Sequence, residues 1–188
     1  MKSYRNRILT MLAALVAIGA TLPSIAADDA SAGVWQLHKY TLNFMGFTTT
    51  YSCDGLEDKV RDLLVWAGAR RDVKSSAFGC NRGFGTPSKF ASTEVTFYTL
   101  AGAAAGDAGA VPATWRKVQW TEHRPLQMSE GDCELVEQFR DQLLPMFTTR
   151  NVNNHMRCEP HAVSPGDLDL EFEVLVPTTP VPAPAKSP

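Results

Sequence analysis

One frame of residues occurs twice in this chain, at a shift of eighty positions. In each copy a strand-like segment leads to a cysteine, a helical pattern follows, and a second cysteine ends the stretch: Cys53 to Cys80, then Cys133 to Cys158. Such a repeat indicates one supersecondary unit used twice, which constrains the fold strongly. The identical pairs are Trp35 and Trp115, Thr41 and Thr121, Cys53 and Cys133, Glu57 and Glu137, Leu63 and Leu143, Leu64 and Leu144, and Arg70 and Arg150.

The spacing of apolar residues changes at the first cysteine of each copy. Before it, apolar and polar residues alternate, which predicts a strand, and after it the apolar residues fall on one helical face. The alternating residues are Tyr40, Leu42 and Phe44 in the first copy and Val118 and Trp120 in the second. The helical stripes are Leu56, Val60, Leu63, Leu64 and Ala67, then Leu135, Phe139 and Leu143.

The ends of both helices carry their own signals. Gly68 is placed to end the first helix in a left-handed conformation, and Pro145 should kink the second helix or end its regular part. Two pairs resemble capping boxes, in which a polar residue and a carboxylate three positions later satisfy the first amides. These pairs are Asp54 with Glu57 and Ser129 with Asp132.

Two further strands are expected in each copy. A short one leads to the second cysteine, over 72–80 and over 152–158, and a clearer one covers Ser92 to Leu100 or Asp167 to Val176. The last of these alternates strictly between carboxylates and apolar residues, so one face should meet the core and the other water. Its carboxylates are Asp167, Asp169, Glu171 and Glu173.

Together these elements predict an α+β fold of two βαββ modules, at 27–100 and 115–176. The strands should form an antiparallel sheet with both helices on one face, a ferredoxin-like arrangement. The stretch 101–114 is rich in Ala and Gly and is expected to be a flexible linker, and 177–188 is a proline-rich tail expected to be disordered.

The N-terminus has the layout of a secretory signal peptide. Three basic residues precede an apolar run from Ile8 to about Leu22, and small residues up to Ala26 suit cleavage there. We therefore expect residues 1–26 to be removed, with no membrane span in the mature chain and a periplasmic or secreted location. Four cysteines in an exported chain predict two disulfides, of which three pairings are possible. If the module is duplicated, each pair closes its own module.

The charge of the mature chain limits its partners. Removing residues 1–26 takes away Lys2, Arg5 and Arg7 and no acidic residue, so the formal charge falls from -2 to -5. Nucleic acids and anionic lipid surfaces are bound chiefly through basic patches, so we expect neither as a partner. A small molecule, a glycan or a protein of the cell envelope remains as the expected partner.

Two segments could bind a ligand. The loop 79–90 is glycine-rich and carries Arg82, although it leads to a strand and not to the helix N-terminus that a phosphate loop requires. The aromatic residues Trp35 and Trp115 could form a binding platform, but aromatic residues in strands more often pack the sheet.

The stretch from His155 to His161 is the nearest approach to a metal site. It also contains Met156 and Cys158, and soft sulfur and imidazole donors suit copper. A disulfide at Cys158 would remove one donor, and residues 155 and 156 would point to opposite faces of a strand. We expect no cofactor.

Signs of catalysis are weaker still. The chain has no G-x-S-x-G and no H-E-x-x-H sequence. His38 and His123 precede the two helices in roughly equivalent segments, and either could act as a base in a site of unfamiliar layout.

At TYSCDGLEDKVRDLL and GDCELVEQFRDQLL the sequence resembles an uncharacterised family of small exported bacterial proteins, marked by a Y-S-C-D-G-L-E motif and four cysteines. The resemblance covers most of the mature chain, but these motifs are structural. It therefore implies no substrate and transfers no catalytic residue.

Three functions remain open from the sequence. The leading hypothesis is a non-enzymatic binding or envelope-associated role. A periplasmic hydrolase whose site is not recognisable from sequence comes second, and a periplasmic copper-binding protein comes third. A histidine within hydrogen-bond reach of both a carboxylate and a hydroxyl would favour the hydrolase.

Overall fold

The computed structural model describes residues 32–82, 86–104, 106–159 and 166–179. Its helices are α1 (Cys53–Ala67) and α2 (Cys133–Gln142), with 3₁₀ turns η1 (Glu130–Asp132) and η2 (Leu144–Met146) on either side of α2. The main strands are β1 (Ala32–Met45), β2 (Lys74–Phe78), β5 (Phe90–Gly102), β6 (Val111–Thr121), β7 (Thr149–Asn154) and β10 (Asp169–Pro177). Two small hairpins pair β3 (Asn81–Arg82) with β4 (Thr86–Pro87) and β8 (Arg157–Cys158) with β9 (Gly166–Asp167).

The six main strands form one antiparallel sheet in the order β2-β5-β1-β6-β10-β7. Each half follows the same path, because the first strand of a half pairs with its last strand and the last pairs with the middle one. The expected α+β class with two helices is confirmed. Among the described residues, the two halves pair at two register positions, Ala32 with Pro112 and Gly33 with Val111.

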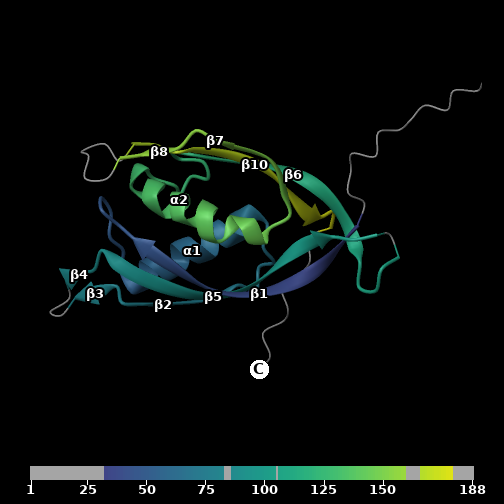
Figure 1. Cartoon of the computed structure of the whole chain (residues 1–188), viewed down its shortest axis with the longest axis horizontal. Coiled ribbons are helices and arrows are strands. Elements are labelled where there is room, and N and C mark those ends of the chain that lie inside the picture. Colours follow the sequence, from purple (N-terminus) through teal and green to yellow (C-terminus); the bar gives the residue numbers. More distant parts are fainter. Residues whose placement is uncertain (1–31, 83–85, 105, 160–165, 180–188) are drawn as a thin grey trace, which may run out of the picture.

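This narrow junction lets the two halves diverge. Figure 1 shows β6, β10 and β7 on one side, β1, β5 and β2 on the other, and both helices between them. One hydrophobic core joins helices and strands of both halves. The helices thus share the inner face of a sharply bent sheet, whereas a ferredoxin-like arrangement would have an open, evenly continuous sheet.

The expected alternation and helical stripes fill this core. All five residues of the α1 stripe are buried, as are Leu135, Phe139 and Leu143 of the second stripe. Trp120 of β6 lies edge-on against Phe139 of α2 and Phe172 of β10, at centroid distances of 5.3 and 5.5 Å. These three rings fix α2 against the second half of the sheet, since each aromatic pair adds about 1 kcal/mol beyond its burial.

The N-terminus of α1 differs in detail from expectation. Its cap is Ser52, whose hydroxyl accepts the amide of Gly55 at 3.1 Å, so the cap lies two residues before Asp54. Glu57 accepts the amide of Ala77 instead, which ties the helix to β2. Gly68 does end the helix in the left-handed region, as expected.

Around α2, the prediction for Pro145 is correct. The regular helix ends at Gln142, and Pro145 lies in the turn η2 that follows. At the other end, Asp132 accepts from both the amide and the hydroxyl of Ser129, and these bonds close the 3₁₀ turn η1. Asp132 directly precedes α2, but no side-chain hydrogen bond caps the helix there.

Three side chains of α2 run along the open edge of β1, and we call them the α2 clamp: Glu134, Gln138 and Gln142. Gln142 and Gln138 each bond both the amide and the carbonyl of a β1 residue, Asn43 and Met45 respectively. Glu134 continues the series by accepting the amides of Phe47 and Thr48. The clamp therefore replaces a neighbouring strand where β6 has diverged from β1.

Both disulfides close their own module, Cys53 to Cys80 and Cys133 to Cys158, which confirms the expected pair of disulfides and the intra-module pairing. The strand bounds differ from expectation around them. The segment 152–158 is split between β7 and β8, and β5 and β6 extend into the stretch 101–114. Residues 1–26 lie outside the described residues, and none of the described helices is long and apolar enough to span a bilayer.

Candidate functional site

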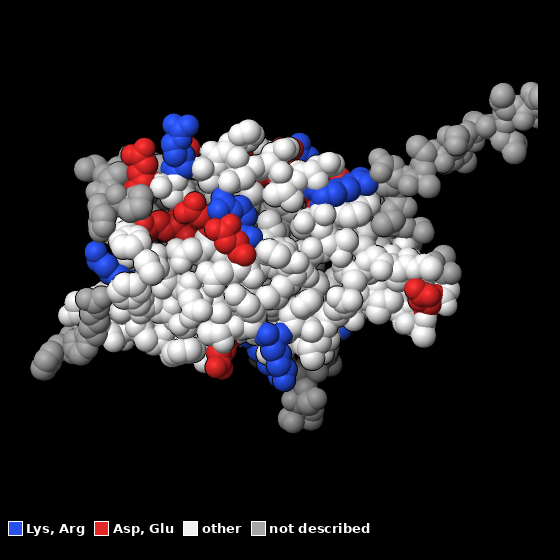
Figure 2. Space-filling view, in the orientation of Figure 1, with Lys and Arg blue, Asp and Glu red and all other residues white. Residues whose placement is uncertain are grey.

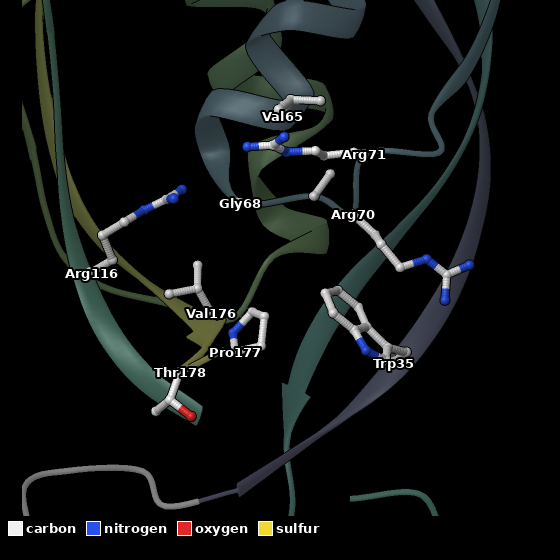
Figure 3. Close-up of a pocket in the computed structure, with 10 residues that line it drawn as sticks. Trp35, Val65, Gly68, Arg70, Arg71, Arg116, Val176, Pro177 and Thr178 are labelled. Carbon is white, nitrogen blue, oxygen red and sulfur yellow. The ribbon is translucent and has the colours of Figure 1, made fainter. Parts of the chain in front are cut away.

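A cleft opens at the carboxyl end of α1, close to where the halves of the sheet diverge; we call it the α1 cleft. Its volume is about 300 Å³, at the lower end of the range for small-molecule sites. Trp35 of β1, Arg116 of β6 and Val176 of β10 line it, together with the turn that follows the helix (Figure 3). Segments distant in sequence thus meet at one site.

The turn after α1 owes its shape to Gly68. At φ 113°, its amide bonds the carbonyl of Val65, while the amide of Ala69 reaches back to Leu64, which is the pattern of a Schellman motif. A β-carbon at Gly68 would lie 3.1 Å from the Cγ1 atom of Val176, so glycine also permits the close approach to β10. The chain therefore leaves the helix sharply and places Arg70 and Arg71 at the rim.

Arg116 reaches the cleft from the opposite wall. Its Nη2 atom donates to the carbonyl of Trp66 at 3.0 Å, one of the carbonyls left open at the end of α1. Partial burial lowers the pKa of Arg116, because a cation is disfavoured away from water. The bond to Trp66 uses one of five guanidinium donors, so other N–H groups stay available to a ligand.

Arg71 and Arg116 point toward one another across the cleft (Figure 3). Neither forms an ion pair with a described residue, and no Asp or Glu is among the described residues that line the cleft. Two converging cations without a counter-charge create a positive potential, which apolar walls make stronger than it would be in water. The arrangement is suited to holding an anion.

Arg70 is engaged elsewhere, although it also lines the cleft. Its guanidinium forms a two-bond pair with Asp72, at 2.7 and 2.6 Å, and lies 3.7 Å from the ring centroid of Tyr98. The hydrogen bonds raise the pKa of Arg70 and lower that of Asp72. The charge of Arg70 is therefore paired, whereas Arg71 and Arg116 have no counter-charge among the described residues.

The two tryptophans that could form a ligand platform have different surroundings. Both pack against a small apolar cluster at the junction of the sheet halves, around Leu100 and Leu175. Trp35 also lines the α1 cleft, whereas Trp115 is not among the cleft residues and lies under Arg150. Only Trp35 is thus placed to contact a ligand in this cleft.

Of the remaining residues predicted to bind a ligand or metal, those that the structure describes do not line the cleft. Arg82 lies on β3 in a small hairpin, and His155 is exposed just after β7. Cys158 is in a disulfide, and His161 lies outside the described residues. Among the described residues no group of three His, Cys, Asp or Glu side chains could hold a metal ion.

His38 meets only part of the requirement for a catalytic base. Its Nε2 atom lies 2.8 Å from the hydroxyl of Thr99, but this hydroxyl donates its proton to the carbonyl of Met146. Thr99 is also only 2% exposed. A buried hydroxyl that donates to a carbonyl is not activated by His38, and burial lowers the pKa of His38. His123 is exposed, in a turn at φ 63°.

Comparisons with protein-family models, with curated proteins and with solved structures found no match. The resemblance to a family of exported bacterial proteins therefore stays a prediction.

Sequence reasoning missed Arg71 and Arg116, and the reason is specific. Each stands next to a residue that the repeat matches, since Arg71 follows Arg70 and Arg116 follows Trp115. The repeat drew attention to Arg70 and Trp115, which have structural contacts. The signal that could have been read is an unmatched arginine beside a matched residue, once in each module.

Proposed function

We propose that this protein is an exported, non-enzymatic binding protein that holds a small carboxylate with an apolar body in the α1 cleft. The observation that carries the proposal is the convergence of Arg71 and Arg116, with no carboxylate among the described residues that line the cleft. A ligand carboxylate placed between them would accept charge-assisted hydrogen bonds from both guanidinium groups, and these are about twice as strong as neutral ones.

The other residues that line the α1 cleft favour a ligand that is apolar away from its carboxylate. Val65, Val176, Pro177 and the ring of Trp35 present apolar surface toward the cleft. A site with a few converging polar groups on an apolar wall is typical of small-molecule binding. A ring or short hydrocarbon chain carrying one carboxylate therefore matches the cleft better than inorganic phosphate does.

Binding is favoured over hydrolysis by the chemistry of the cleft residues. Arginine does not give up its proton near neutral pH, so neither Arg71 nor Arg116 can serve as a general base. The hydroxyl of Thr178, also at the cleft, donates to the carbonyl of Pro112 at 3.3 Å. These groups bind and orient an anion without providing an activated nucleophile.

The location is part of the proposal. Two disulfides support folding in an oxidising compartment outside the cytoplasm, where the cysteines of small proteins persist as bridges. We place the protein in the periplasm or outside the cell, after removal of residues 1–26, as a member of the exported family that it resembles. Its ligand would then be a metabolite or breakdown product present in the envelope.

Calorimetric titration of the mature protein with benzoate, at low ionic strength, tests the proposal. Benzamide serves as the neutral ligand of the same shape. Benzoate should bind and benzamide should bind at least tenfold more weakly, since the amide lacks the charge that Arg71 and Arg116 recognise. Equal binding of both, or binding of neither, contradicts the proposal.

Variants locate the site. Arg71→Gln and Arg116→Gln should each weaken benzoate binding about tenfold, and the matched control Arg61→Gln should not. Arg61 is exposed on α1 and pairs only with Asp58 among the described residues. Arg116 also hydrogen-bonds the carboxyl end of α1. If Arg116→Gln loses stability for that reason, the result for Arg71→Gln alone decides whether benzoate binds in the cleft.

A further inference from the structure

Part of the β6 edge that faces away from β10 carries backbone groups without a partner among the described residues. The β6–β10 register is regular from Thr121 to Ala113, and the Thr178 amide extends it to the Pro112 carbonyl. Thr121 turns its amide and carbonyl the other way, to Arg124. Since these directions alternate along a strand, the odd-numbered residues between them face the open edge. Among them are Trp115, Lys117 and Gln119, whose open-edge backbone groups bond no described residue.

The other half of the molecule shows what such an edge can bind. There the α2 clamp supplies hydrogen bonds to the backbone of β1 at Asn43 and Met45. The positions of α1 that the repeat matches to the clamp are Asp54, Asp58 and Asp62, and none of them bonds the described backbone of β6. The open edge of β1 is thus hydrogen-bonded within the molecule. The open edge of β6 has no such partner among the described residues.

A groove runs between this edge and α1; we call it the β6 groove. Its volume is about 550 Å³, and its walls include Trp66 of α1 and the edge residues Lys117 and Gln119. Four cations line it, while its described lining contains no Asp or Glu. One of them, Lys117, pairs with Glu171 at 2.9 Å. The other three are Arg71, Arg116 and Arg124.

We infer that the β6 groove accepts an extended acidic peptide segment, which adds to β6 as a further strand. Main-chain bonds to Lys117 and Gln119 would supply affinity, and acidic side chains at alternate positions would meet Arg71 and Arg116. Leu126, which is 81% exposed at the end of the groove, offers an apolar contact. The inference rests on the proposed function in one respect, that Arg71 and Arg116 bind carboxylates, since both residues line the β6 groove as well as the α1 cleft.

Charge decides against a second copy of this chain as the occupant. If the β6 edges of two copies paired, the cations of one groove would face those of the other, and like charges directly opposite destabilise a strand pair. An acidic segment meets the same cations with complementary charge. Its carboxylates also distinguish it from a neutral peptide, which would gain only the main-chain bonds.

The probe is a fluorescein-labelled peptide amide of sequence Asp-Thr-Glu-Thr-Asp, titrated with the mature protein at low ionic strength and followed by fluorescence anisotropy. Two control peptides separate the components of binding. The first, Asn-Thr-Gln-Thr-Asn, removes the charge, and the second carries N-methyl groups on both threonines and so removes two backbone donors. Each control should bind at least tenfold more weakly than the parent peptide.

On the protein side, Gln119→Pro deletes an amide that faces the open edge and leaves every β6–β10 bond in place. It should weaken peptide binding about tenfold, whereas Gln119→Ala, which keeps the amide and removes only side-chain atoms from the groove wall, should weaken binding clearly less than Gln119→Pro does. If Gln119→Pro does not fold, the N-methylated peptide still tests the same hydrogen bonds.

The outcomes separate this inference from the proposed function. Equal binding of the N-methylated and parent peptides overturns strand addition and leaves anion binding intact. Benzoate binding without binding of the acidic peptide overturns the peptide as the ligand. Equal binding of the acidic and neutral peptides overturns the role of charge. A dimer in sedimentation that Gln119→Pro abolishes would make a second copy the occupant and overturn the inference as well.

Discussion

The guanidinium of Arg150 lies over the ring of Trp115, with its carbon 4.4 Å from the ring centroid. The repeat-matched Arg70 lies over Trp35 in the same way, at 5.7 Å. The same cation–π contact thus occurs twice between residues that recur in the sequence, once on each side of the junction between the sheet halves. Each arginine is also held by a carboxylate, Arg70 by Asp72 and Arg150 by Glu173.

Replacing Arg150 by lysine should therefore destabilise the fold while keeping the charge. Lysine lacks the planar group that stacks on Trp115, so Arg150→Lys should lower the free energy of unfolding by about 1 kcal/mol. Urea denaturation measures this difference. The control Arg61→Lys, at an exposed site on α1, should change stability by less than about 0.5 kcal/mol. Equal effects at both sites would show that the stacking contributes nothing.

Among the carboxylates of the fold, Asp132 should be the one whose replacement lowers the free energy of unfolding most. Burial raises its pKa, but hydrogen bonds from Lys59, Tyr51 and Ser129 outweigh this and hold the pKa below its ordinary value. Asp132→Asn removes the charge that pairs with Lys59 and should cost about 3 kcal/mol. Asp58→Asn, at an exposed ion pair, is the control and should cost less than about 0.5 kcal/mol. Urea denaturation measures both costs. A similar cost at the two positions would contradict a stabilising role for the ion pair between Asp132 and Lys59.

The α2 clamp predicts a selective change in hydrogen exchange. Gln138→Ala should raise the exchange rate of the Met45 amide, and Gln142→Ala that of the Asn43 amide, because each glutamine accepts one of these protons. Each variant should cost about 1 kcal/mol. Exchange measured residue by residue by NMR provides the test, with Gln119→Ala as the control. Unchanged rates at both amides would mean that the clamp does not persist in solution.

Each disulfide should contribute comparably to stability, because both close loops of similar length. In the chain-entropy estimate, loops of this size stabilise the fold by about 3.5 kcal/mol each. Cys53→Ala with Cys80→Ala should lower the free energy of unfolding by that amount, and so should Cys133→Ala with Cys158→Ala. Urea denaturation of the two double variants compares them. A loss confined to one pair would contradict equivalent roles.

His38 should make stability fall in mildly acidic solution. Burial lowers its pKa in the folded state below the value of 6.5 that it has when unfolded. The unfolded chain therefore takes up this proton first, so the contribution of neutral His38 is complete above pH 6.5 and is lost as the pH falls through 6.5 toward the folded pKa. His38→Gln should remove this part of the pH dependence. A stability profile that is the same in both proteins would contradict it.

Much of the fold could be predicted from sequence, because local patterns determine it. The helical stripe from Leu56 to Ala67 and the alternation from Leu168 to Val174 both follow from which face meets the core. The cap at Ser52 was missed since Ser52 and Asp54 are both good caps only two residues apart. The sharp bend was missed because it depends on the two register pairs at Gly33 and Ala32, which no local pattern encodes.

The candidate site was harder to predict than the fold. Arg71 and Arg116 come from different modules and meet only because the turn at Gly68 brings the end of α1 close to β10 and β6. Trp35 was singled out as a possible ligand contact and does line the cleft, but nothing in its neighbourhood in the sequence indicates Arg71. A site assembled across a junction depends on tertiary geometry.

The central claim is that the α1 cleft binds a carboxylate between Arg71 and Arg116. The measurement that tests it most directly is a titration of the ¹⁵N-labelled mature protein with benzoate, followed by two-dimensional NMR. The account predicts saturable shifts of the backbone amides of Gly68, Arg71, Arg116 and Val176, together with the guanidinium Nε signals of the two arginines. Shifts scattered over the surface, or shifts at the cleft that persist in Arg71→Gln with unchanged affinity, would contradict it.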